Sequence, residues 1–170
     1  MRRALVPALV ATLIIEALQL TVLSSLRIEG VVVMLVWLWP LTMGLTGFTS
    51  LALVTALVAG VFFDTHANTP FGLTAVVALV LAYAASRLGR EGVGDLDSAA
   101  WWVTPALAAL GGFVAPMLYV VAGAGALDFN LWRGSVLMMM FINAGAFFLL
   151  ARPMARLARA IANVGERVRR

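Results

Sequence analysis

The sequence predicts an all-α integral membrane protein built as one bundle of six transmembrane helices. Hydrophobic residues make up 63% of its 170 residues and charged residues 12%, whereas soluble domains are about half apolar and a quarter charged. The apolar residues form long continuous runs without the alternation of a strand. Because lipid offers the backbone no hydrogen-bond partner, such runs must be helical. We expect about six helices of ~20 residues in a single domain over residues 1–170.

The basic charge of the chain indicates membrane orientation and not nucleic-acid binding. The net charge is +4 and the pI is about 11.0, but the basic residues lie at the chain ends and beside the apolar runs. Basic residues in these places set the orientation of membrane helices. Cysteine is absent, which excludes disulfides, thiol nucleophiles and thiolate metal sites.

The first apolar run, Ala4–Leu23, follows two arginines and resembles the start of a signal peptide. The run is too long for a signal peptide and carries Glu16 and Gln19, and no convincing cleavage motif precedes a soluble domain. We predict that it is retained as the first membrane helix.

The second helix is expected over residues 30–44, and it holds Trp37, Trp39 and Pro40. Proline inside a helix predicts a kink, and tryptophans are typical of the membrane interface. The link to the next helix at residues 44–47 has room only for a tight turn or a partly re-entrant bend.

Residues 47–88 predict a membrane hairpin with a polar tip. Two apolar runs, 48–63 and 71–88, flank the turn at 64–70, which contains Asp64, His66 and Pro70. One histidine and one nearby acid are too few for a zinc or di-metal site. We expect Asp64 to cap the end of the helix at 48–63 or the start of the turn, and residues 70–72 to begin the helix at 71–88.

Two further helices are expected at 99–121 and 131–150, after a glycine-rich charged loop at 89–98 and a turn at 123–130. Gly111 and Gly112 predict close approach of a neighbouring helix, and Pro116 predicts a bend. The tail at 151–170 predicts an amphipathic basic helix lying on anionic lipid, with Leu157 and Ile161 on one face. Its charges are Arg152, Arg156, Arg159, Arg167, Arg169 and Arg170 against Glu166.

Arginine positions predict that both termini are cytoplasmic. With six spans, ten arginines fall on the side of the termini and two, Arg27 and Arg133, on the other side. This matches the bias of basic residues toward the cytoplasm. The hairpin tip at 64–70 then faces away from the cytoplasm.

Three residues with carboxyl or amide side chains lie inside the predicted spans. Glu16 and Gln19 are three residues apart and share one helix face. They are interpreted either as a proton or cation site, a docking point for a partner's polar group, or an interhelical hydrogen bond with Glu16 protonated or near a donor. Asn143 is expected to bridge to the first helix or to another protein, a bond worth ~0.6 kcal/mol on average. Met138 to Met140 are interpreted as adaptable packing.

Catalysis is not expected. No nucleophile is paired with a base, no glycine-rich phosphate loop follows a strand, and no HExxH pattern occurs. The predicted protein therefore has no catalytic residue, no cofactor and no metal.

The hairpin resembles that of the rod-shape-determining protein MreD family, small inner-membrane components of the bacterial cell-elongation machinery. The resemblance rests on AGVFFD at 59–64, TPFGL at 69–73 and LAY at 81–83, which include Gly60, Asp64, Pro70, Gly72 and Tyr83. Supporting matches are Gln19 in the first helix, the tryptophan- and proline-containing second helix, and Asn143 before the basic end of the last helix.

The resemblance implies a non-enzymatic scaffold in the bacterial inner membrane. Members of this family bind the single-span protein MreC and with it link MreB filaments to the peptidoglycan glycosyltransferase RodA and its transpeptidase partner. We expect a lipid-facing groove, helped by Gly60, Gly111 and Gly112, that a partner helix fills.

The family is also similar in fold to the substrate-binding subunits of energy-coupling-factor vitamin transporters. This similarity gives the alternative, a transporter subunit whose pocket is closed by the 64–70 loop. Ala4 and Ala8 weakly resemble the contact that such subunits make with their coupling partner, whereas the outer halves of the helices carry few polar side chains.

Overall fold

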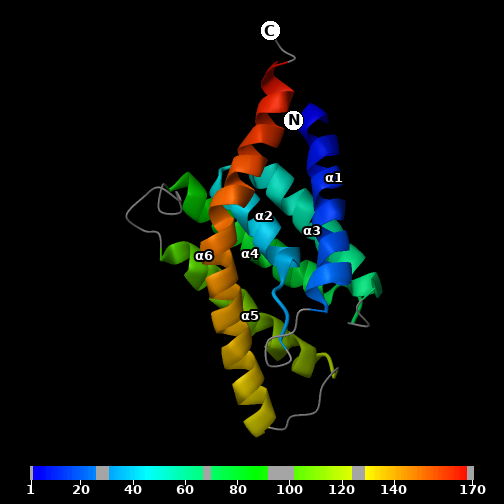
Figure 1. Cartoon of the computed structure of the whole chain (residues 1–170), viewed down its shortest axis with the longest axis vertical. Helices are drawn as coiled ribbons and strands as arrows, with labels where there is room; N and C mark the ends of the chain where they lie inside the picture. Colours follow the sequence, from blue (N-terminus) through cyan, green and yellow to red (C-terminus); the bar gives the residue numbers. More distant parts are fainter. Residues whose placement is uncertain (1, 26–30, 67–69, 92–101, 124–128, 168–170) are drawn as a thin grey trace.

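The chain folds as an α-helical bundle. The computed structural model describes residues 2–25, 31–66, 70–91, 102–123 and 129–167, and this part of the chain contains helices and no β-strand (Figure 1). The prediction of an all-α fold is confirmed. The elements are α1 (Arg2–Leu18), the π-helical turn η1 (Gln19–Leu23), α2 (Leu35–Leu45), α3 (Thr49–His66), α4 (Leu73–Arg90), α5 (Val103–Val121) and α6 (Phe129–Arg167).

Five segments are long and apolar enough to cross a membrane, and α2 is not one of them. The second helix, predicted at residues 30–44, is shorter than expected, because residues 31–34 are not helical. The helix has 11 residues and a length of about 16 Å, against roughly 30 Å of hydrocarbon. The non-helical residues 31–34 precede it, and extended backbone adds about 3.3 Å per residue. Together they cover about 30 Å, so this crossing is helical over only part of its length.

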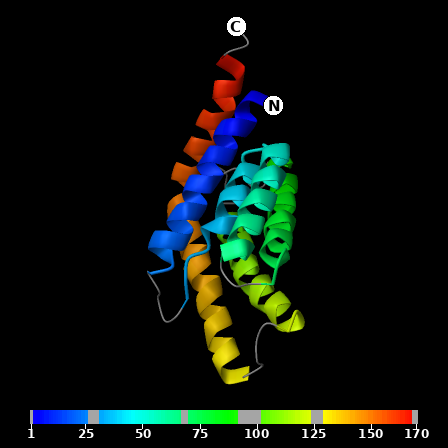
Figure 2. The ribbon, with the colours of Figure 1, turned by 90° about the vertical axis from the view of Figure 1, so that its right-hand side faces the viewer.

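The interrupted crossing lies in the centre of the bundle. All the residues of α2 are buried, and α2 packs against α3 and α4 and also contacts α1, α5 and α6. Figure 2 shows α1 and α6 on one side of it and α3 and α4 on the other. Irregular backbone at membrane depth is tolerated where protein surrounds it. Trp37 and Trp39 are completely buried, so the prediction that they lie at the membrane interface was wrong.

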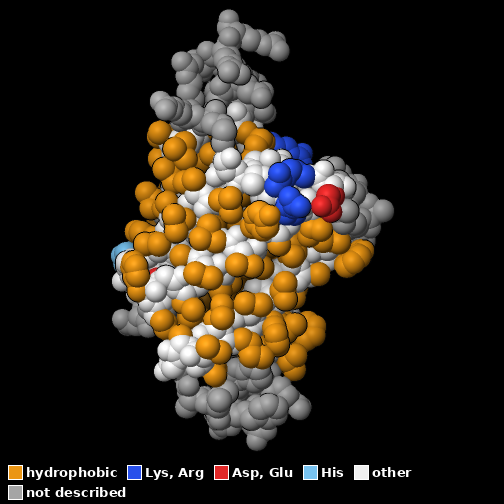
Figure 3. Space-filling model, turned by 180° about the vertical axis from the view of Figure 1, so that it is seen from behind, with side chains coloured by type: hydrophobic (Ala, Val, Ile, Leu, Met, Phe, Trp, Pro, Cys, Tyr) orange, Lys and Arg blue, Asp and Glu red, His pale blue; other side chains and the backbone are white. Residues whose placement is uncertain are grey.

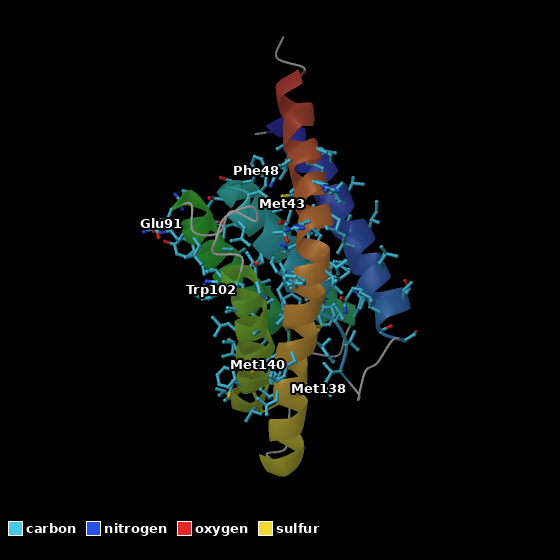
Figure 4. All side chains as sticks on the ribbon, turned by 60° about the vertical axis from the view of Figure 1, so that its left-hand side comes forward. Met43, Phe48, Glu91, Trp102, Met138 and Met140 are labelled. Atoms are coloured by element: carbon cyan, nitrogen blue, oxygen red, sulfur yellow. The ribbon has the colours of Figure 1, made fainter. Side chains whose placement is uncertain are left out.

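A tight turn joins α2 to α3, as predicted. Gly47 has a φ of 87°, which favours glycine, and the Phe48 N–H donates to the Met43 carbonyl at 3.1 Å. Met43 and Phe48 accordingly lie close together where the two helices meet (Figure 4).

Glycines allow helices to touch within the bundle. A Cβ atom on Gly60 would lie 2.2 Å from the Ala75 Cα, and one on Gly112 would lie 2.8 Å from the Met139 carbonyl oxygen. Gly111 likewise faces the side chains of Leu81 and Trp37. The expectation that these glycines line a lipid-facing groove was wrong, because neighbouring helices of the same chain already occupy the space beside them.

The basic tail continues α6 without a break at Pro153 as far as Arg167. Ala155, Ala158 and Ile161 are buried, whereas Leu157 is 43% exposed. Leu157 and Ile161 therefore do not share one buried face, and α6 runs on beside α1 instead of turning onto the membrane plane (Figure 2). Binding of anionic lipid to this segment stays a prediction.

The N-terminal end of α1 and the C-terminal end of α6 lie at the same end of the bundle (Figure 1). Arg87, Arg90, Arg152, Arg156 and Arg159 lie toward this end as well, whereas Arg133 belongs to the first turns of α6 at the opposite end. A Cβ on Gly89 would meet the Leu45 carbonyl oxygen, and the Thr42 hydroxyl lies 3.9 Å from the Met154 sulfur. These contacts place the C-terminal end of α4, with Arg87 and Arg90, level with the arginine-bearing part of α6.

The α3–α4 contact gives a first prediction. We expect Gly60→Ala to lower the midpoint of thermal unfolding in detergent by several degrees, because the added Cβ meets the backbone of Ala75 and forces the helices apart. Gly145→Ala in α6 is the matched control, since a Cβ there meets nothing within 4 Å, and alanine favours a helix by about 0.5–1 kcal/mol over glycine. Equal effects of the two substitutions would contradict the proposed contact.

Candidate functional site

A stripe of polar side chains on α1 faces the short helix α2. Thr12, Glu16 and Gln19 are spaced four and three residues apart, and all are nearly or completely buried. The Trp39 indole N–H donates to the Thr12 hydroxyl at 3.2 Å, and the Leu35 N–H donates to the Gln19 Oε1 at 2.7 Å. The two bonds show that α1 and α2 run antiparallel, with the polar stripe between them.

Two of the predicted polar residues cap the start of α2. The first N–H groups of a helix have no partner within the helix and must find one elsewhere. The Leu35 N–H donates to Gln19, the first residue of η1, and the Met34 N–H donates to the Asn143 Oδ1 of α6 at 2.9 Å. The Asn143 amide group in turn donates to the Met139 carbonyl at 2.8 Å, which orients its oxygen toward Met34. Residues from both ends of the chain thus satisfy one interrupted helix.

The predicted interhelical bond of Gln19 is confirmed. The prediction for Asn143 was wrong in its partner, because its side chain binds backbone at the start of α2 rather than α1. An exposed side chain can turn to a new partner, but a backbone N–H inside hydrocarbon has only the groups around it. The side chains of Gln19 and Asn143 therefore bind the N–H groups of residues 35 and 34, which have no other acceptor within the described part of the chain.

Gln19 also begins the π-helical turn η1, which ends at Leu23. Single π-helical turns within α-helices are rare and occur often at functional positions. The wider turn begins at the residue whose side chain reaches α2. The alternation of apolar and polar residues in this segment does not distinguish a π-turn from an α-helix, so the π-turn could not be predicted.

Glu16 lies between Thr12 and Gln19 and is completely buried. Neither carboxyl oxygen has a hydrogen-bond partner within the described part of the chain. Its burial rules out direct docking to a partner's polar group in this conformation. Among the described residues no group of three or more histidine, cysteine or acidic side chains lies together, so Glu16 is not part of a multidentate metal site. A proton or cation site at Glu16 stays a prediction.

A second polar group lies at the tip of the hairpin. The Asp64 carboxylate accepts the Thr74 N–H at 3.1 and 3.3 Å and the Ala75 N–H at 3.4 Å. The Thr74 hydroxyl lies 2.9 Å from the Tyr119 hydroxyl of α5. Asp64 therefore caps the start of α4, a role that was not predicted, and the turn residues 67–69 that it was predicted to cap lie outside the described part of the chain. The carboxylate of one helix favours the positive N-terminus of the next.

The other hairpin residues have separate positions. The Leu73 N–H donates to the Pro70 carbonyl at 3.1 Å, and Gly72 has a φ of 87°, so these two shape the turn before α4. His66 is exposed, with its ring Nδ1 2.8 Å from the Phe62 carbonyl of its own helix, and Asn68 lies outside the described residues. Tyr83 is 52% exposed on the outer face of α4.

Three members of these groups were not predicted: Thr12, Thr74 and Tyr119. Thr12 was detectable, because it lies one turn before Glu16 on the same face of α1. Thr74 and Tyr119 are 45 residues apart in the chain and belong to different helices, so only the fold brings them together. Met138 and Met140 are partly buried on the half of α6 that lies beside α5, in agreement with a packing role (Figure 4).

Comparison with protein families, curated proteins and solved structures gives no match to this chain. Gln19, Asn143 and Asp64 each accept hydrogen bonds from backbone N–H groups at a helix start. Such an arrangement fixes how the helices meet, and it does not pair an acid with a base.

The caps of α2 give a second prediction. We expect Gln19→Met and Asn143→Leu each to lower the free energy of unfolding by about 1–3 kcal/mol, because each leaves one buried N–H without an acceptor. The double variant should lose less than the sum of the single variants, since both side chains support the same helix start. Chemical or thermal unfolding in detergent micelles measures these changes.

Glu16→Gln is the control for the cap variants. It lies between the caps on the same face and loses no hydrogen bond seen in the structure. It should therefore cost less than either cap variant. If Glu16→Gln destabilises the protein as strongly as Gln19→Met, burial and not capping explains the sensitivity of this stripe.

Proposed function

We propose that this chain is a non-enzymatic scaffold of the bacterial elongation machinery. In this role it binds MreC in the inner membrane and helps to couple MreB filaments to RodA and its transpeptidase partner. Both termini would be cytoplasmic, which agrees with the arginines that lie toward the end of the bundle where α1 begins and α6 ends. The exposed Arg152, Arg156 and Arg159 would face anionic headgroups there.

One observation supports this proposal most: the residues that carry the family resemblance lie together in the α3–α4 hairpin and shape it. Gly60 lets α3 touch α4 at Ala75, Asp64 caps the start of α4, and Gly72 makes the left-handed turn between them. These residues hold the two helices of the hairpin against each other. A rigid hairpin with an apolar outer surface suits a protein that presents helices to other membrane proteins.

The interrupted helix α2 favours a second candidate, the substrate-binding subunit of an energy-coupling-factor vitamin transporter. Transporters often bind solutes at broken helices, where free N–H groups face the ligand. In this chain Gln19 and Asn143 already occupy the N–H groups of residues 35 and 34. These two N–H groups at the start of α2 are therefore not free to bind a solute, and we prefer the scaffold role.

Co-expression with an MreC protein from the same organism tests the proposal. We expect the two proteins to remain associated through mild detergent extraction and size-exclusion chromatography. An MreC variant whose membrane helix is replaced by an unrelated apolar helix is the control and should associate less. If the natural pair never associates, the scaffold role is wrong.

A thermal-shift screen with vitamins separates the two candidates. The scaffold predicts no stabilisation by any vitamin. A ligand at one hundred times its dissociation constant would stabilise a binding subunit by about 2.7 kcal/mol, and such a shift would favour the transporter role.

A further inference from the structure

The outer face of α4 combines apolar, aromatic and basic side chains in one line. We call the surface formed by Val76, Val80, Tyr83 and Arg87 the α4 face. The steps of four, three and four residues place these side chains on one side of the helix, and all four are exposed. Figure 3 shows this side of the molecule, with hydrophobic side chains over most of the surface and arginine side chains gathered at its edge.

The Tyr83 hydroxyl lies deep in the predicted membrane. Tyr83 is seven residues from Arg90 and ten from Leu73, or about 10 and 15 Å from the two ends of α4. Helical side chains lean toward the N-terminus of their helix, which directs this hydroxyl away from the nearer end. The side chain is 52% exposed, and its hydroxyl has no hydrogen bond within the described part of the chain. Hydrocarbon offers none either.

Other outward faces lack this feature. Val6, Val10 and Ile14 on α1, and Phe141 and Phe148 on α6, are exposed and consist of hydrocarbon, which lipid chains solvate well. The exposed Thr21 of the first membrane segment is satisfied by its own helix, because its hydroxyl donates to the Ala17 carbonyl at 2.6 Å. An unsatisfied hydroxyl in the hydrocarbon therefore distinguishes the α4 face from these surfaces.

We propose that the α4 face is the docking surface for a single transmembrane helix of a partner protein. The partner helix carries a hydrogen-bonding side chain level with Tyr83 and an acidic side chain level with Arg87. The two levels are four residues, or about 6 Å, apart along α4, so the partner's two side chains are spaced by about one helical turn. This inference rests on the proposed scaffold function and gives its partner surface a location.

A lipid headgroup does not explain both groups. A phosphate at the membrane surface can pair with Arg87 or Arg90 at the end of α4. Tyr83 lies about 6 Å from Arg87 and about 10 Å from Arg90 along α4, and its side chain leans toward Leu73, so its hydroxyl lies deeper in the hydrocarbon than either arginine. A partner helix that runs along α4 contacts both Tyr83 and Arg87. The binding free energy of each polar contact then adds to that of packing against Val76 and Val80.

The test uses a synthetic helix as the probe. The probe has about 20 leucine and alanine residues, with one asparagine and, one turn along, one glutamate. Its association with the whole protein in phosphatidylcholine nanodiscs is followed by energy transfer between fluorophores. The polar probe should bind more tightly than a probe of leucine and alanine alone.

Tyr83→Phe should weaken binding of the polar probe about threefold, the value of one average interhelical hydrogen bond, and leave the apolar probe unaffected. Arg87→Gln should remove the advantage that the glutamate confers. Arg152→Gln, which changes an exposed arginine of α6, is the matched control and should have no effect. Neither test variant breaks a buried contact, so the melting temperature should stay at the wild-type value.

Equal binding of the two probes, or wild-type binding by Tyr83→Phe and Arg87→Gln, would overturn the proposed surface. An effect of Arg87→Gln that appears only with anionic lipid, and is the same for both probes, would assign the arginine to lipid and also overturn it. If MreC co-purifies while the probe test fails, the scaffold role stands and the surface is elsewhere. If the probe test succeeds while MreC does not bind, the surface stands and the partner is a different protein.

Discussion

The need to satisfy backbone N–H groups within hydrocarbon decides where the polar residues of this protein lie. Water is absent there, so each helix start must receive its acceptors from another part of the chain. Gln19 and Asn143 supply them to α2, and Asp64 supplies them to α4. Side chains that first suggest ion binding or catalysis thus hold the bundle together.

This constraint also explains how a short helix can occupy the centre of the bundle. Residues 31–34 leave the helical conformation, which frees backbone groups at membrane depth. The first membrane segment, through Gln19 of η1, and α6, through Asn143, come from opposite ends of the chain, and each contributes one amide side chain to that point. The α1–α2 and α2–α6 contacts are therefore specified by hydrogen bonds as well as by apolar packing. Glycines complete the arrangement by letting α3 approach α4 and α5 approach α6.

The long spans were predictable from the sequence, and the helix starts were not. Apolar runs predicted α1, α3, α4, α5 and the first part of α6, because their length and composition alone indicate membrane helices. The composition of the apolar run at 30–44 suits a helix and an extended segment alike, so the position where α2 begins could not be predicted. That position is stabilised by Gln19 and Asn143, which lie outside this run in the sequence.

The candidate site shows the same division. The sequence indicated that Gln19, Asp64 and Asn143 were unusual, because polar groups are costly in a membrane. Their partners are backbone N–H groups, which almost every residue type has, so the sequence does not show which of them is bound. Gly60, Gly111 and Gly112 predicted close helix contacts, but only the structure showed that the contacts lie within this chain. The positions of the arginines predicted the basic segment after residue 150. Only the structure shows that this segment continues α6 and packs through the buried Ala155 and Ala158.

Amide hydrogen exchange, measured by NMR in lipid nanodiscs, tests the central claim most directly. The account predicts that the Met34 and Leu35 amides are protected in the wild-type protein. It further predicts that Gln19→Met speeds exchange mainly at Leu35 and Asn143→Leu mainly at Met34. Rapid exchange of both amides in the wild type, or no site-specific change in the variants, would contradict it.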